Sequence, residues 1–118
     1  MSTGSDRLSS KEDWSDKWSG QAIEKITFNP QQPGFRDQHR ILMRTLPHNA
    51  DVRFLEIGCY LGYMMWYFHH YFGYQVSGLE YVDWCCDKAR ELLAGAGVPG
   101  DVIHGDLFTW KPESPETQ

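Results

Sequence analysis

The sequence predicts an α/β domain built on a parallel sheet, and three short apolar runs carry this prediction. The runs begin near Val52, Gln75 and Asp101, and each leads into a turn that contains an acidic residue or a glycine. Segments long enough to form helices separate them, and strands that alternate with helices pair in parallel through crossover connections. A chain of 118 residues has room for one such domain at most.

Two helices are expected ahead of the first strand. The residues at 9–12 match a capping box, which predicts a helix from there to about Ile26. The turn residues at 29–34 predict a loop. A second helix is expected over 35–46 because its apolar residues share one face, and Pro47 ends it.

Strands and helices alternate strictly after these two helices. They are expected over 52–57 (strand), 61–72 (helix), 75–80 (strand), 83–93 (helix) and from Asp101 onward (strand). Gly73 closes the first of these helices. Asp83 is the expected N-cap of the second, since a short acidic side chain can accept the exposed backbone amides there.

Two aromatic-rich parts of the sequence, the helix over 61–72 and the pair Trp14 and Trp18, each have two interpretations. The helix expected over 61–72 is apolar on almost every face, apart from His69 and His70. It is either a core helix packed on more than one side or a surface that meets another chain. Trp14 and Trp18 share one face of the first helix, where they either pack on the core or help to cover a ligand cleft.

Composition and charge disfavour several classes of protein. The net charge of −5 argues against binding to nucleic acid through its phosphates, which requires a basic face. No apolar run is long enough to cross a membrane, and residues 1–10 lack the apolar core of a signal peptide. The cysteines number three, which favours reduced thiols and a cytoplasmic location. Their spacing and that of the histidines are not typical of a metal site.

The stretch from Val52 to Gly62 contains the strongest functional signal. An apolar strand carries Glu56 near its end, turns at Gly58 and Gly62, and enters an apolar helix. A strand that leads in this way into a helix N-terminus forms a ligand site at the carboxyl end of a parallel sheet. We expect Gly58 to permit the tight turn and Gly62 to let the helix lie close to the strand.

The other two strands also end at acidic residues. Glu80 ends the second strand, 22 residues after Gly58, where a carboxylate accepts from both hydroxyls of a ribose in nucleotide-binding βαβ units. Asp106 stands in the turn after the third strand. No glycine lies between Gly58 and Gly62, which disfavours a dinucleotide site because its motif is G-x-G-x-x-G. The alternative for Glu56 and Glu80 is that each is an ordinary solvated acid at the end of a strand.

The three motifs, in this order and at these intervals, resemble the N-terminal half of class I (Rossmann-like) S-adenosylmethionine-dependent methyltransferases. The resemblance extends from about residue 40 to residue 110. It implies that Glu56 helps to hold the methionine part of the cofactor and that Glu80 binds its ribose. The cofactor-binding residues that it implies are Glu56, Gly58, Cys59, Tyr60, Gly62, Glu80, Tyr81, Asp106 and Leu107.

The same resemblance assigns the adenine end of S-adenosylmethionine to residues after the second and third strands. Tyr81 is implied to lie against the adenine face. Asp106 accepts from the exocyclic amine, and the backbone amide of Leu107 meets a ring nitrogen. The sequence departs from the family at Tyr60, where glycine is common, although some small-molecule O-methyltransferases of the catechol type have an aromatic residue there.

The resemblance further implies strand order 3-2-1 and a chain that carries only part of the domain. We expect an N-terminal helical segment over 1–50 and a partial S-adenosylmethionine-binding domain over 51–118. The expected function is methyl transfer to a small-molecule acceptor by in-line displacement, in which positioning supplies most of the rate. No catalytic residue is assigned, because a general base is either unnecessary or expected in the half of the domain that the resemblance does not cover. The alternatives are a non-catalytic S-adenosylmethionine-binding module that needs a partner chain, and a nucleotide-binding or structural fragment.

An unpaired first strand is the basis for expecting a homodimer. In the family's strand order this strand is central, so without a fourth strand the run over 52–57 presents an apolar edge. Two copies related by a two-fold axis could pair these strands in antiparallel fashion. A swapped N-terminal segment that covers the edge is the alternative.

Overall fold

The described part of the chain is built on a three-stranded parallel sheet. The computed structural model describes residues 25–111. Its strands β1 (Arg53–Ile57), β2 (Gln75–Glu80) and β3 (Gly100–His104) pair in the order β1-β2-β3. Read from the other edge this is the order 3-2-1, so the predicted sheet is confirmed.

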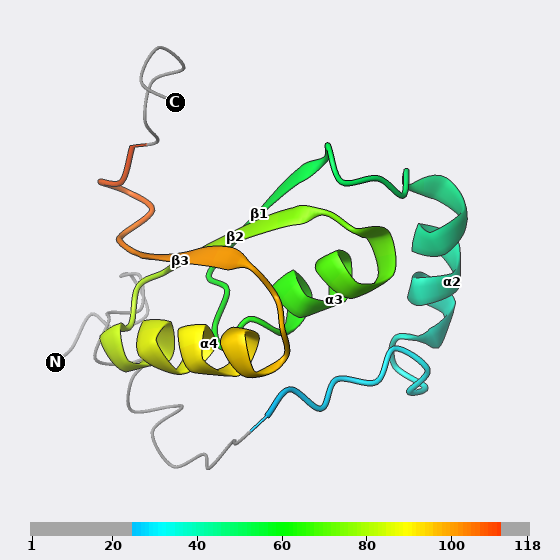
Figure 1. Ribbon diagram of the computed structural model, residues 1–118, viewed down its shortest axis with the longest axis horizontal. Helices are drawn as coiled ribbons and strands as arrows, with labels where there is room; N and C mark the ends of the chain where they lie inside the picture. The colour runs from blue at the N-terminus through cyan, green and yellow to red at the C-terminus, as the bar shows by residue number, and fades with distance from the viewer. Residues whose placement is uncertain (1–24, 112–118) are drawn as a thin grey trace, which may run out of the picture.

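Three helices accompany the sheet, namely α2 (Arg36–Thr45), α3 (Tyr63–Phe72) and α4 (Asp83–Gly95). α3 packs on β1 and β2, while α4 packs on β2 and β3. Both lie on the same side of the sheet, and α2 lies beyond α3 at the end away from α4 (Figure 1). Every element predicted between residues 35 and 104 is found with its ends within two residues of the expected positions.

The predicted N-cap of α4 is wrong. Val82 is the capping residue, in an extended conformation and without a side-chain cap, and Asp83 is the first residue of the helix. The Asp83 carboxylate instead pairs with Nε2 of His104 at 2.5 Å, across to the end of β3. The helix predicted over 9–26, with Trp14 and Trp18, lies essentially outside the described residues.

α3 is covered on two sides, which explains its aromatic composition. On the side of α2, the hydroxyl of the fully buried Tyr67 shares a hydrogen bond with Nδ1 of His39 at 2.7 Å, and Phe35 meets the Tyr67 ring edge-on. On the side of the sheet, Phe68 stacks on Phe54 of β1 with ring centroids 4.4 Å apart. The interpretation of this segment as a core helix is therefore confirmed.

Helices pack on one face of the sheet, and side chains of β1 on the other face are exposed. Side chains alternate along a strand, so Phe54 and Glu56 of β1 face the helices, and Leu55 and Ile57 face the other way. Leu55 is 43% exposed and Ile57 is 46% exposed. Within the described residues β1 is also an edge strand, so its outer face and its edge are both open there.

Three further expectations bear on the described range. Cys59, Cys85 and Cys86 are buried and free, which agrees with the predicted thiols. Among residues 25–111, no cluster of three or more histidine, cysteine or acidic side chains is arranged to hold a metal ion. No helix in the same range combines the length and apolarity required to span a membrane.

Candidate functional site

The residues singled out by the sequence converge at one end of the sheet. Because the strands are parallel, Glu56, Glu80 and the turn that contains Asp106 all lie at their carboxyl ends. Figure 1 shows the three strands ending on the same side of the molecule, opposite to α2. The loop from Gly58 to Gly62 leaves this end of β1 and leads into α3.

Three of the five residues in this loop have left-handed backbone conformations. The φ angles are +71° at Gly58, +51° at Tyr60 and +88° at Gly62. Glycine adopts such angles without steric cost, so the predicted tight turn at Gly58 is confirmed. The close neighbour of Gly62 is different from the one expected. A Cβ there would stand 3.0–3.3 Å from Leu93 of α4, so Gly62 makes room for a side chain of α4 rather than for the strand.

Tyr60 is the non-glycine residue with positive φ in the described range. A left-handed conformation costs an L-residue about 1–2 kcal/mol, which gives a physical reason why glycine is favourable at this position. The ring offsets part of this cost by packing beside Tyr63 and against the buried cluster of Leu61, Val82, Cys85 and Leu92. The departure from the family pattern is thus accommodated by packing.

Glu80 holds the loop in place. It is only 7% exposed. Its Oε1 accepts the backbone amide of Tyr60 at 2.7 Å, and its Oε2 accepts the amide of Val82 at 3.0 Å. Each carboxylate oxygen has a second lone pair, so both can still accept from the hydroxyls of a ligand.

The loop directs most of its amides inward. Gly58 and Cys59 both donate to the carbonyl of Leu79, at 2.7 and 3.2 Å, and Gly62 donates to the carbonyl of Cys59 at 2.8 Å. Together with the bond from Tyr60 to Glu80, four of the five loop amides are occupied. The loop therefore shapes the site more than it offers donors to a ligand.

Glu56 is the most strongly perturbed acid of the site. Burial, and then the charge of Glu80, raise the pKa of its carboxyl to about 7. Its Oε1 is buried and has no hydrogen-bond partner among the described residues. A buried polar atom without a partner is costly and uncommon in folded proteins, so this oxygen marks a position where a ligand donor or a proton would be stabilised.

Gly78 supports this arrangement and was not singled out from the sequence. It pairs with Glu56 across β1 and β2, and Glu80 follows two residues later on the same face. A Cβ at Gly78 would stand 2.6 Å from Sγ of Cys59 and 2.7 Å from Sδ of Met65. A glycine inside a strand often marks a close approach of this kind, which is the signal that could have identified it.

Cys59 contributes a buried thiol rather than a reactive group. Burial, followed by the charges of Glu80 and Glu56, raises the pKa of this thiol to about 12. The thiolate needed for nucleophilic chemistry is therefore scarce near neutral pH. Its place in the site comes from its position over Gly78 and in the loop.

The turn after β3 is fixed by Asp106. Its Oδ1 accepts the amide of Phe108 at 2.9 Å, and its carbonyl accepts the amides of Thr109 and Trp110 at 3.0 and 2.7 Å. Neither the second carboxylate oxygen nor the backbone amide of Leu107 has a partner among residues 25–111. One acceptor and one adjacent donor thus remain for a ligand, the pair that an adenine edge requires.

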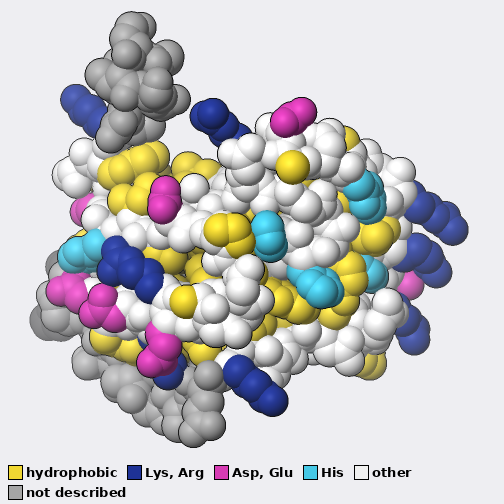
Figure 2. All heavy atoms as spheres, viewed as in Figure 1, with side chains coloured by type: hydrophobic (Ala, Val, Ile, Leu, Met, Phe, Trp, Pro, Cys, Tyr) yellow, Lys and Arg dark blue, Asp and Glu magenta, His cyan; other side chains and the backbone are white. Residues whose placement is uncertain are grey.

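Apolar side chains border this end of the sheet. Tyr81 is 36% exposed, Leu107 is 51% exposed and Phe108 is 76% exposed. Figure 2 shows apolar side chains gathered at the surface in this part of the molecule, next to an acidic side chain. A planar, partly apolar ring could pack on such a border.

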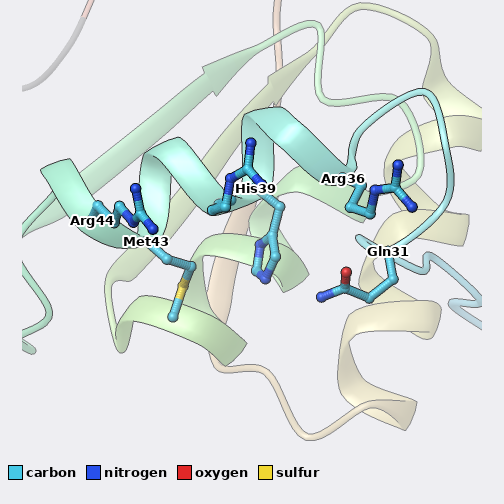
Figure 3. Close-up of a pocket in the computed structure, with 6 residues that line it drawn as sticks. Gln31, Arg36, His39, Met43 and Arg44 are labelled. Atoms are coloured by element: carbon cyan, nitrogen blue, oxygen red, sulfur yellow. The ribbon is translucent and has the colours of Figure 1, made fainter.

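A hollow of about 430 Å³ lies elsewhere, along α2 (Figure 3). It is lined by Gln31, Arg36, His39, Arg40, Met43 and Arg44. Basic side chains project from this end of the molecule in Figure 2, opposite to the strand ends. Since it contains none of the residues at the carboxyl end of the sheet, it is separate from the candidate site.

Comparison with solved structures finds the same fold in several proteins, among them methyltransferases. The PH0226 protein from Pyrococcus horikoshii OT3 matches with a TM-score of 0.63 and 18% identity, over 83% of this chain and 45% of that chain. A methyltransferase from Thiobacillus denitrificans, in complex with S-adenosyl-L-homocysteine, matches with a TM-score of 0.59 and 22% identity, over 85% and 38%. Geranyl diphosphate C-methyltransferase from Streptomyces coelicolor A3(2) matches with a TM-score of 0.58 and 16% identity, over 89% and 49%.

The fold is that of class I methyltransferases. The chain spans less than half the length of each of these three structures, and this coverage is consistent with the N-terminal half of their domain. No protein-family model matches the chain, and no curated protein sequence does either.

Proposed function

We propose that this chain binds S-adenosylmethionine and serves as the cofactor-binding part of a methyltransferase for a small-molecule acceptor. The observation that carries the proposal is the meeting of Glu56, Glu80 and Asp106 at one sheet end, beside the left-handed loop at Gly58–Gly62. The fold shared with methyltransferases, two of them solved with S-adenosyl-L-homocysteine, supports it.

The chemistry of the residues fits this cofactor. Glu56 offers a buried, unpartnered oxygen to a cationic group of the methionine part. Glu80 offers two oxygens to the ribose hydroxyls while it holds the loop. The Asp106–Leu107 turn offers an acceptor and a donor to the adenine edge. The cofactor supplies an activated methyl group on a sulfonium sulfur; these residues bind and orient it.

Calorimetry tests the binding. The chain should bind S-adenosylmethionine in preference to NAD, and Glu80→Ala should weaken binding by about 1–3 kcal/mol, because ligand hydroxyls lose their acceptors. Glu91→Ala, which changes a well-exposed acid on α4, is the matched control. Equal affinity for NAD, or equal effects of the two substitutions, would contradict the proposal.

The adenine assignment has a sharper test in Asp106→Asn. The asparagine oxygen can still accept the amide of Phe108 and so keep the turn, while its amide nitrogen replaces the free acceptor with a donor. Adenosine analogues, which present an amine there, should bind more weakly. Inosine analogues, which present a carbonyl, should bind as well or better. Equal losses for both would exclude the role of Asp106.

The same residues are compatible with a binding module that needs a partner chain for catalysis. The groups assigned at this sheet end all face the cofactor, and none of them is assigned to a methyl acceptor. Transfer of a labelled methyl group to candidate small acceptors by the isolated chain separates the two. Cofactor binding without any transfer supports the module, and transfer supports the enzyme.

We also propose a homodimer, formed in the cytoplasm through the open edge of β1. The exposed Leu55 and Ile57 and the edge position of β1 support it, since such edges pair readily with a second strand. Sedimentation at micromolar concentration should give a dimer, and Ile57→Lys should give a monomer. A monomeric parent chain would contradict the proposal.

A further inference from the structure

Glu56 and Glu80 form an acidic pair inside the candidate site. Glu56 pairs with Gly78 across the strands, and Glu80 lies two residues further on the same face of β2. Gly78 has no side chain that could separate them. After burial, the charge of Glu80 is the second cause of the raised pKa of Glu56, which agrees with their positions on the same face of neighbouring strands.

Among residues 25–111, no lysine or arginine forms an ion pair with either carboxyl, and the charged group that acts on Glu56 is Glu80. The loop also carries Cys59, whose thiol pKa is raised by burial and then by both carboxylates. On α4, burial and then the charge of Glu80 raise the thiol pKa of Cys86. Arg90 of α4 acts on Cys86, but its guanidinium is bonded to Asp87 and to the carbonyl of Val102. From α3 the neighbour over Gly78 is the uncharged Met65. Ionisation of both buried carboxyls without a neighbouring cation is energetically unfavourable, because burial and the like charge each disfavour the second negative charge.

The two carboxyls differ in the hydrogen bonds that they accept. Glu80 accepts two backbone amides, one at each oxygen. Glu56 has a buried oxygen with no partner in the described range. A proton on Glu56 relieves the repulsion within the pair, and an incoming positive group would relieve it in the same place. The proton and the positive group therefore compete for one position.

We infer that Glu56 holds a proton beside the Glu80 carboxylate in the free protein, and that it releases this proton when a positively charged ligand group enters the pair. This inference rests on the proposed function, in which the entering group belongs to the methionine part of S-adenosylmethionine. Binding of the cofactor is then an exchange of a proton for a cation. Affinity rises with pH up to the pKa of Glu56, about 7, and levels off above it.

Calorimetry in two buffers of different ionisation enthalpy measures the exchange. At about pH 6.5, binding of S-adenosylmethionine should release about three quarters of a proton, the fraction of Glu56 that is protonated there. Between about pH 6 and pH 7.5 the affinity should rise about eightfold. Adenosine has neither the sulfonium nor the ammonium group, so it should bind without proton release.

Glu56→Gln is the matched variant, because glutamine imitates the shape of the protonated acid and does not titrate. It should bind S-adenosylmethionine with no proton release and with an affinity that stays level over the same pH range. Binding by the parent chain without proton release, or the same release from Glu56→Gln, would overturn the exchange and leave the proposed function standing. Failure of S-adenosylmethionine to bind at any pH would overturn the proposed function and the exchange with it.

Discussion

Replacement of Glu56 by glutamine should stabilise the folded chain at alkaline pH and leave it unchanged at acidic pH. The folded protein raises the pKa of this carboxyl from its ordinary value of 4.5 to about 7. Below about pH 4.5 the acid is protonated in both the folded and the unfolded chain. As pH rises through about 7 the folded protein loses this proton and, with it, the stability that the raised pKa conferred. Glu56→Gln avoids that loss because it has no proton to release.

The magnitude follows from the same pKa. A change from 4.5 to about 7 sets an upper bound of about 3–4 kcal/mol, at about 1.4 kcal/mol per tenfold change in proton affinity. Solvent reaches part of the side chain and screens the Glu80 charge, so we expect about 1–2 kcal/mol.

Urea unfolding of both proteins at about pH 5 and about pH 8 is the assay. Glu91→Gln, at a well-exposed position on α4, controls for the general loss of a negative charge and should show little pH-dependent difference from the parent. The reasoning is refuted if Glu56→Gln differs from the parent by the same amount at both pH values, or if it is the less stable protein at pH 8.

Three further predictions concern the loop and its supports. Tyr60→Gly should be more stable to urea than Tyr60→Ala by about 1 kcal/mol, because both lose the ring and only alanine keeps the left-handed penalty; equal stabilities would mean that φ at this position is not strained. Gly78→Ala should lower the free energy of unfolding by about 1–3 kcal/mol through overpacking, whereas Gly34→Ala, with nothing within 4 Å of the new methyl, should be nearly neutral; similar losses at both would contradict the close approach. Burial raises the pKa values of the thiols to about 11–12, so mass spectrometry should find the native chain resistant to alkylation at about pH 8 and labelled only in denaturant; fast labelling of native protein would count against this packing.

The sequence predicts the strands, the helices after residue 35 and the acidic strand ends because their signals are local. A turn glycine or a run of apolar residues acts within a few positions of itself, and all of these are found near the expected places. The contacts that support the site depend on residues far apart in the chain. Leu93 of α4 lies against Gly62. The Asp83 carboxylate, which was expected to cap α4, pairs instead with His104 at the end of β3. Neither contact has a signature in the local sequence.

The aromatic helix α3 shows a second limit of prediction from local sequence. Its apolar character on every face correctly predicts burial on more than one side. The apolar pattern does not predict which element packs on the second side of the helix, because many apolar surfaces could bury it equally well. The cover comes from α2, through the pair of His39 and Tyr67 and the ring of Phe35. Such a polar pair inside an apolar interface selects one partner among several, since His39 and Tyr67 would each be left unsatisfied against a purely apolar face.

The glycine loop and the second acid act as one unit, although the sequence presents them as two motifs. The left-handed turn at Tyr60 directs its amide to Glu80, and the other oxygen of Glu80 fixes the amide of Val82 at the start of α4. One carboxylate thus ties the loop after β1 to the segment after β2. Removing it should loosen the loop as well as the ribose position, so part of the loss in Glu80→Ala is expected to come from the loop. Thermal unfolding of Glu80→Ala without ligand tests the structural role. A lower midpoint than that of the Glu91→Ala control would indicate a loosened loop, whereas an unchanged midpoint would assign the whole loss of affinity to the ligand contact.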